Sequence, residues 1–204
     1  MTTPLRTLLA RRLDGALDAI AALREQLDEI EVLIETLHRT AATGGIIATC
    51  GNGGSAAEAL HLAEELVGRY RSDRAPLRAL CLNADPTALT CIANDFGFSE
   101  IFARQVRGLL RRGDCLVVFS TSGRSENLLR ALTAARELGV VTIGLLGRDG
   151  GDALRLCTHA LVVSANDSAH IQEAHQVLMH FVCESFEASV VAVKAGSEGS
   201  AVPE

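Results

Sequence analysis

The first forty residues carry two apolar stripes with the spacing of amphipathic helices. One stripe comprises Leu5, Leu8, Leu9, Leu13, Leu17, Ile20 and Leu23, and the other comprises Leu27, Ile30, Leu33, Ile34 and Leu37. Residues three or four positions apart share one face of a helix, so the pattern predicts two helices over Pro4–Ala42. We expect a helical hairpin, residues 1–43, that takes part in oligomerisation. Periodicity alone is equally compatible with a hairpin that covers the chain's own sheet.

Beyond residue 44, short apolar runs alternate with longer amphipathic stretches. The runs predict strands at Ile46–Cys50, Leu77–Leu82, Cys115–Ser120, Val140–Leu146 and Ala160–Val163. The stretches predict helices at Ser55–Arg69, Thr87–Asn94, Phe98–Leu110, Ser125–Leu138, Asp149–Leu156 and Ile171–Val193. This alternation is typical of a parallel sheet covered on both faces, so we expect an α/β three-layer sandwich with a five-stranded parallel sheet. That domain would span residues 44–193, before a polar tail, residues 194–204, expected to be disordered.

Composition narrows the class of protein. A chain of 204 residues that is 48% hydrophobic can bury one core, so a single α/β domain is expected. The net charge of −6 argues against a nucleic-acid-binding surface. The six cysteines include no Cys-x-x-Cys pair, which argues against a zinc ribbon or a disulfide framework. Neither a signal peptide nor an apolar run of about 18 residues is apparent, so we expect a cytoplasmic protein without membrane contact.

A glycine turn joins the first predicted strand to the next helix. It reads Gly51-Asn52-Gly53-Gly54-Ser55. Glycines allow close approach of a ligand to the backbone, and the helix that follows presents unpaired N–H groups, which suits a phosphate. No Gly-Lys-Ser/Thr follows and the third glycine of a dinucleotide fingerprint is missing, so the turn is neither a P-loop nor a Rossmann motif.

A second loop rich in hydroxyl groups follows the third predicted strand. It reads Ser120-Thr121-Ser122-Gly123-Arg124-Ser125, and Ser125 is a natural N-cap for the next helix. Taken alone, the loop is also compatible with a capping turn that has surplus serines. Both loops follow parallel strands and therefore lie at the carboxyl edge of the sheet, where ligands bind in such folds. Together they favour a phosphate site.

Histidines and carboxylates on two helices could supply the chemistry. His61 and Glu65 are one turn apart on the helix after the glycine turn, so they share a face. The C-terminal helix carries Gln172, Gln176 and His180 among apolar residues. Helix geometry favours Gln176 as the partner of His180, because Gln172 and His180 are about 12 Å apart along the axis.

These motifs, taken in order, resemble those of the sugar-isomerase (SIS) domain family. They are Gly51–Ser55, then His61 and Glu65 before Gly68-Arg69-Tyr70, then Asn94-Asp95-Phe96-Gly97, then Ser120–Gly123, then Ile171-Gln172-Glu173 before His180. The glycine turn and the serine loop are shared across the family and indicate a phosphosugar. The remaining motifs are more specific and resemble the branch that acts on sedoheptulose 7-phosphate, over residues 10–189.

The resemblance implies a flavodoxin-like subunit in a homotetramer with active sites between subunits. It implies isomerisation of D-sedoheptulose 7-phosphate to D-glycero-D-manno-heptose 7-phosphate through an enediol(ate), the first step of activated-heptose biosynthesis. It assigns Glu65 and His180 as the acid/base pair. It also implies one Zn²⁺ per subunit, held by His61, Glu65, Gln172 and His180. The implied substrate-binding residues are Asn52, Gly53, Gly54, Ser55, Glu65, Arg69, Asn94, Asp95, Ser120, Thr121, Ser122, Ser125 and Gln172.

Three other functions are compatible with the scaffold. Some relatives are non-catalytic tetramers that bind the bacterial replication initiator, and these tend to lose the histidine at the position of His180, which this chain keeps. A sugar-phosphate sensor would need a fused DNA-binding module, and no helix-turn-helix extension is present. Isomerisation of a different phosphosugar is the third alternative. One departure from the family pattern, Ala169-His170 before Gln172, affects the expected loop contacts.

Overall fold

Five parallel strands form the centre of the computed structural model, which describes the backbone of residues 4–198 and the side chains of residues 4–188. The strands are β1 (Ile47–Gly51), β2 (Ala79–Cys81), β3 (Cys115–Ser120), β4 (Val141–Gly147) and β5 (His159–Val163). Their order is β2-β1-β3-β4-β5, and β1 lies in register with β3 from Ile47 opposite Cys115 to Gly51 opposite Phe119. This is the flavodoxin-like order, whose ligand crevice lies at the carboxyl ends of β1 and β3.

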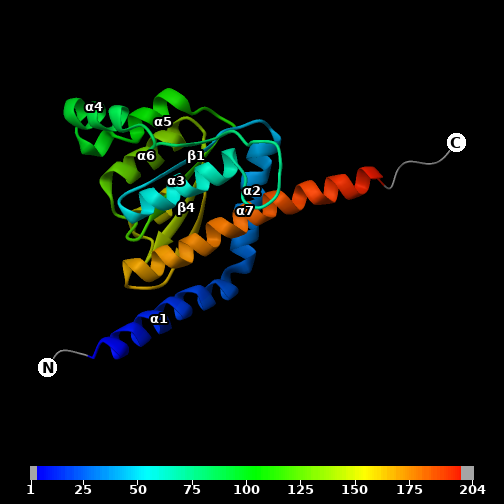
Figure 1. The fold of residues 1–204 in the computed structure, drawn as a ribbon. Coiled ribbons are helices and arrows are strands. Elements are labelled where there is room, and N and C mark those ends of the chain that lie inside the picture. Colours follow the sequence, from blue (N-terminus) through cyan, green and yellow to red (C-terminus); the bar gives the residue numbers. More distant parts are fainter. Residues whose placement is uncertain (1–3, 199–204) are drawn as a thin grey trace.

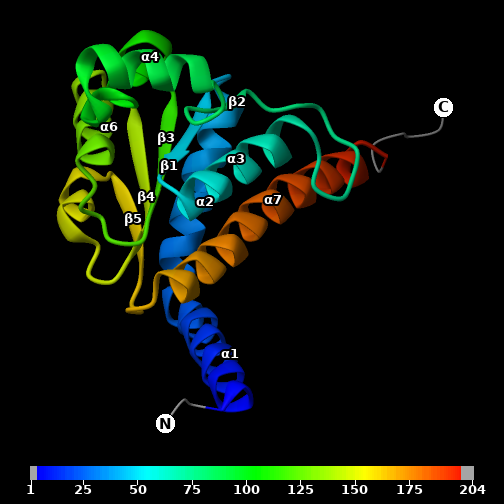
Figure 2. The ribbon, with the colours of Figure 1, turned by 60° about the vertical axis from the view of Figure 1, so that its left-hand side comes forward.

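Helices cover both faces of the sheet and make the three layers that the sequence predicts (Figure 1). They are α1 (Leu5–Ala21), α2 (Leu27–Ala42), α3 (Gly54–Val67), α4 (Pro86–Phe96), α5 (Ala103–Leu109), α6 (Glu126–Glu137) and α7 (Ser168–Glu198), with 3-10 turns η1 (Ala22–Gln26), η2 (Phe98–Glu100) and η3 (Gly151–Leu156). Figure 2 shows the sheet between α2, α3 and α7 on one side and α4 and α6 on the other. Among the described residues, no helix is both long and apolar enough to cross a membrane.

Strand side chains alternate between two apolar clusters, one on each face of the sheet. In β3, Val117 and Phe119 join the cluster under α2, α3 and α7, whereas Leu116 and Val118 join the cluster under α5 and α6. Successive residues of a strand point to opposite faces, so a strand buried on both sides must be apolar at every position. That requirement explains why uninterrupted apolar runs located the strands in the sequence.

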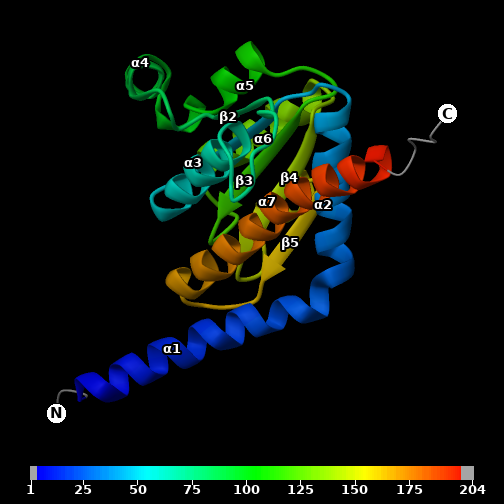
Figure 3. The ribbon, with the colours of Figure 1, turned by 45° about the vertical axis from the view of Figure 1, so that its right-hand side comes forward.

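The N-terminal helices form an elbow where the sequence predicted a hairpin. α1 continues through η1 into α2, and Figure 3 shows α1 projecting from the body at an angle to α2. A hairpin needs a turn that reverses the chain, but Ala22–Gln26 contains neither glycine nor proline and keeps helical backbone angles up to Gln26. α1 instead packs on the first turns of α7, where Arg12 donates to Glu173 and Gly15 lies against the ring of His170.

Some element boundaries also differ from the prediction. The helix expected at Phe98–Leu110 is divided into η2 and α5, and the one expected at Asp149–Leu156 is the 3-10 turn η3. α7 begins at Ser168, where the Asp167 carboxylate accepts a hydrogen bond from the Ala169 N–H and satisfies the helix start. It runs to Glu198, so residues 194–198 of the expected disordered tail are helical. The rest of that tail, residues 199–204, lies outside the described residues.

Candidate functional site

The glycine turn sits at the carboxyl end of β1, anchored by asparagines from neighbouring loops. The Asn83 side chain accepts from the Gly51 N–H at 3.1 Å and donates to the Gly51 carbonyl at 3.0 Å. The amides of Asn52 and Asn127 pair reciprocally, at 2.9 and 2.8 Å. Gly53 has a positive φ of 58° immediately before α3, a conformation that favours glycine. The turn is therefore held rigidly at the start of α3, where the helix dipole favours an anion.

The serine loop lies beside the glycine turn, at the carboxyl end of β3, as predicted. Ser120 Oγ accepts from the Gly123 N–H at 3.0 Å, and Ser122 Oγ accepts from the Arg124 N–H at 3.3 Å. Thr121 Oγ1 lies 3.4 Å from Ser168 Oγ, at the start of α7. Ser125 occupies the N-cap position of α6, but its side chain makes no capping hydrogen bond. The Ser125 hydroxyl thus retains its full hydrogen-bonding capacity for a ligand.

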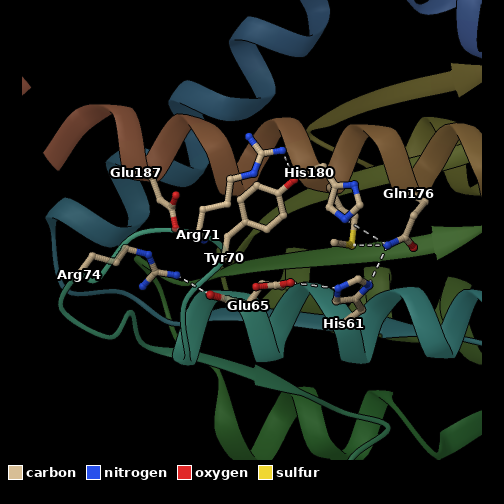
Figure 4. Close-up of polar contacts among 9 residues, drawn as sticks. His61, Glu65, Tyr70, Arg71, Arg74, Gln176, His180 and Glu187 are labelled. Atoms are coloured by element: carbon tan, nitrogen blue, oxygen red, sulfur yellow. Dashed lines mark hydrogen bonds and ion pairs between the residues drawn. The ribbon is translucent and has the colours of Figure 1, made fainter. Parts of the chain in front are cut away.

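His61, Glu65 and His180 come together across the seam between α3 and α7 (Figure 4). His61 Nε2 lies 3.1 Å from Glu65 Oε1, and the His61 and His180 rings meet edge to face with centroids 5.7 Å apart. Gln176 lies between the histidines, with its Nε2 atom 2.7 Å from His61 Nδ1 and 3.5 Å from His180 Nε2. An amide nitrogen can only donate, so His61 Nδ1 accepts and His61 Nε2–H donates to Glu65.

The chain that follows α3 covers the open side of His180. Tyr70 stacks on the His180 ring at 5.3 Å between centroids, and the Arg71 guanidinium lies over Tyr70 at 4.6 Å. Glu187 of α7 accepts from the Arg71 and Ser72 N–H groups. Arg74 donates to the Leu66 carbonyl and to the Glu65 carbonyl at the end of α3, the latter contact being drawn in Figure 4. Burial, followed by the nearby His61, lowers the pKa of His180 from its usual 6.5. The neutral imidazole is therefore favoured, and it can accept a proton or bind a metal ion.

The donor atoms on α3 are close enough to bind one cation. His61, Glu64 and Glu65 each offer a ligand atom, and these atoms all lie within 4.8 Å of one another. Imidazole and carboxylate groups are ordinary ligands of Zn²⁺. The residues therefore fit a metal ion. Metal binding at His61 Nε2 would displace the hydrogen that this nitrogen donates to Glu65.

Gln172 lies away from the other three predicted ligands within one chain. Its side-chain amide rests against Gly54, where an added Cβ would be 2.4 Å from Gln172 Nε2. Gly54 and His61 are about two helical turns apart on α3, so Gln172 faces the glycine turn. Gln176 takes the position beside His61 and His180. Its i,i+4 spacing to His180 was the sequence signal for this contact.

The remaining predicted residues are spread around the site. Asn94 and Asp95 are exposed on α4, where Asn94 donates to Asp95 at 2.8 Å. α4 packs against the cluster under α5 and α6, away from the His61 seam, and lines a pocket of about 300 Å³ with Gly51, Asn52 and Gly53. Arg69 is exposed and donates to the Arg71 carbonyl. No sequence signal marks Asn83, Asn127 or Glu64, because their roles depend on contacts between distant segments or on side-chain orientation.

Comparison with known proteins agrees with this arrangement of a flavodoxin-like sheet and two polar loops. Residues 13–147 match the model of the SIS domain family, and the chain belongs to that family.

Several relatives at 40–51% identity are phosphoheptose isomerases. The phosphoheptose isomerase of a Nitratiruptor species is 51% identical over 143 residues, which is 70% of this chain and 76% of the relative. That of Helicobacter pylori is 45% identical over 170 residues, 83% of this chain and 86% of the relative. The solved phosphoheptose isomerase from Neisseria gonorrhoeae is 36% identical, with a TM-score of 0.85 over 91% of this chain and all of that one.

Proposed function

We propose that this protein is an isomerase that converts D-sedoheptulose 7-phosphate to D-glycero-D-manno-heptose 7-phosphate, the first step toward activated heptoses. Its relatives at 45–51% identity are named phosphoheptose isomerases. The observation that carries the proposal is the meeting of Glu65 with His61 and His180 on the α3–α7 seam. A carboxylate beside two imidazoles can move protons between adjacent carbon and oxygen atoms.

The reaction needs a base at carbon and an acid at oxygen. Glu65 removes a proton from C1 of the ketose while the C2 carbonyl oxygen is protonated, which gives the enediol. The proton then returns to C2, and the O1 hydroxyl loses its proton as the aldehyde forms at C1. We assign the carbon-bound proton to Glu65 and the oxygen-bound protons to His180, whose neutral ring gives its one N–H proton to O2 and then takes up the proton that O1 loses.

The two polar loops anchor the phosphate far from the reacting carbons. Asn52, Gly53, Gly54 and Ser55 would hold it on one side, and Ser120, Thr121, Ser122 and Ser125 on the other. Arg69, Asn94, Asp95 and Gln172 are proposed to bind sugar hydroxyls or order the site. Binding energy from such a remote group orients the reacting carbons and so contributes to the rate.

A Zn²⁺ ion, one per subunit, is proposed at His61, Glu65, Gln172 and His180. When bound, the ion would supply Lewis-acid polarisation of the substrate carbonyl. Gln172 faces Gly54 in its own chain, so this ligand set calls for Gln172 of a second subunit or for Gln176 in its place. The adjacent Glu64 carboxylate is a further candidate on α3.

A homotetramer with active sites between subunits is part of the same proposal, as is a cytoplasmic location. The outer face of α1 supports the oligomer, because Leu5, Leu8, Leu9, Leu13 and Leu17 are 54–68% exposed. A row of leucines this exposed on a projecting helix is typical of a surface that another protein covers.

Turnover of sedoheptulose 7-phosphate by the purified protein tests the proposal. We expect formation of the aldose phosphate, its loss on chelation and its recovery with Zn²⁺. His180→Ala should lower kcat by about 10²-fold or more. His159→Ala, a half-buried histidine on β5, is the matched control and should keep its activity. A folded wild-type tetramer that binds the sugar phosphate without converting it would contradict the enzyme and favour a binding role.

A further inference from the structure

A carboxylate and an imidazole are buried between α3 and α7, beneath the candidate site. Glu58 is 6% exposed and His175 is fully buried. Glu58 Oε2 lies 3.9 Å from His175 Nδ1, and neither Glu58 oxygen nor His175 Nδ1 has a hydrogen-bond partner among the described residues. Buried polar groups normally have partners, so two that face each other alone call for an explanation.

The surroundings set which ring nitrogen of His175 carries a hydrogen. His175 Nε2 lies 3.2 Å from the Leu146 carbonyl, which can only accept, so Nε2 carries a hydrogen. His175 Nδ1 faces Glu58, and the His175 and Phe119 rings pack edge to face. At 3.9 Å the two groups face each other across the seam without a direct hydrogen bond, so the contact between them is electrostatic and joins α3 to α7.

The pair lies on the two helices that carry the acid/base residues and contacts β3 and β4. Glu58 is one turn from both Ser55 and His61 on α3, and His175 precedes Gln176 on α7. Phe119 is followed by the serine loop, and Leu146 is the residue before Gly147, the last residue of β4. A change in the contact between Glu58 and His175 would therefore move the acid/base residues relative to the phosphate loops.

We propose that Glu58 and His175 are positioning residues, whose buried contact fixes α3 against α7 so that Glu65 and His180 face the same substrate atoms. This inference rests on the proposed isomerase function. Neither side chain reaches the substrate, because both are buried below the seam. Their effect is on geometry, and small displacements of acid/base groups slow the chemical step more than they weaken binding.

Steady-state kinetics of Glu58→Gln and His175→Gln test the proposal. Each should lower kcat about 10- to 100-fold with the KM for sedoheptulose 7-phosphate changed less than about 2-fold. The double variant should be no slower than the slower single variant, because removing one partner already breaks the pair. Glu58→Asp keeps the carboxylate and should recover part of the kcat lost in Glu58→Gln.

Thr142→Val is the matched control for loss of a buried polar group. Thr142 is fully buried on β4, where it pairs with Thr158 and the Leu156 carbonyl, away from the seam. It should lower the melting temperature without lowering kcat. Single variants of Glu58 and His175 with wild-type kcat, or losses that add fully in the double variant, would overturn the proposal.

The ¹⁵N chemical shifts of His175 test the pairing without any activity. Glu58→Gln should shift the Nδ1 resonance and leave the Nε2 resonance nearly unchanged. If Glu58→Gln does not fold, the same measurement is made on Glu58→Asp. An unchanged Nδ1 resonance would overturn the pair even in an active enzyme. If Glu58→Gln shifts the Nδ1 resonance but the wild-type protein converts no sugar phosphate, the isomerase function is wrong and the pair stands.

Discussion

The two helical layers of this protein pack against the same sheet with different side chains. α5 and α6 meet their face of the sheet through apolar residues, among them Val106, Leu128 and Leu132. On the other face, the seam of α3 and α7 contains Glu58 and His175 in its interior and His61, Glu65 and His180 at its rim. Polar groups in such a seam oppose folding unless they are paired. Their concentration on one face therefore indicates that this face keeps them for function, at some cost in folding stability.

Glu65→Gln is expected to produce the largest effect. The amide keeps the shape of the side chain but cannot take a proton from carbon, so kcat should fall about 10²- to 10⁴-fold. The melting temperature should stay close to that of the wild type, because Glu65 lies at the rim of the seam. Turnover assays and thermal unfolding on the same preparations measure both.

Glu137→Gln, an exposed carboxylate at the end of α6, is the control for Glu65→Gln. It should leave both kcat and the melting temperature unchanged. Near-normal turnover by Glu65→Gln would show that the base is another group and would remove the main functional difference between the two layers.

Leu132→Ala should separate stability from catalysis on the apolar face. Leu132 is fully buried on α6, and its truncation should cost about 2–5 kcal/mol of unfolding free energy. The kcat per folded molecule should stay at the wild-type value. Denaturant unfolding and turnover normalised to the folded fraction measure the two quantities.

Leu62→Ala makes the same truncation on the catalytic face. Leu62 is 1% exposed and lies next to His61 on α3. It should cost a similar unfolding free energy and also lower kcat, because α3 carries the acid/base residues. Equal kcat values for the two leucine variants would mean that the seam tolerates movement of α3.

The sequence predicted the sheet and part of the site because both depend on local spacing. The bounds of β3 follow from an apolar run buried on both faces, and the His61–Glu65 contact follows from one helical turn. The approach of α7 to α3 depends on tertiary packing. For that reason the position of Gln172 at Gly54 and the pairing of Glu58 with His175 could not be read from the sequence. The elbow at Gln26 was missed because the helix signal continues through it.

Gln176→Leu is expected to give the smallest effect, by disturbing the seam without removing an acid/base group. Leucine is similar in size but cannot donate to His61 Nδ1, so the tautomer and ring orientation of His61 are held from one side only. Loss of such an orienting contact typically costs about 10- to 100-fold in metal affinity or activity, and we expect the lower end because Glu65 still holds His61 Nε2.

Gln105→Leu is the matched variant for Gln176→Leu. Gln105 of α5 is a partly buried glutamine that donates to the Leu82 and Ile101 carbonyls on the opposite face. It should lower stability and leave kcat/KM and Zn²⁺ affinity unchanged, whereas Gln176→Leu should lower both by about 10-fold. If the two variants lose activity equally, polar contacts on both faces support the site, and the functional division between the layers fails. If only Gln176→Leu loses activity, the α3–α7 seam alone orients the reacting groups.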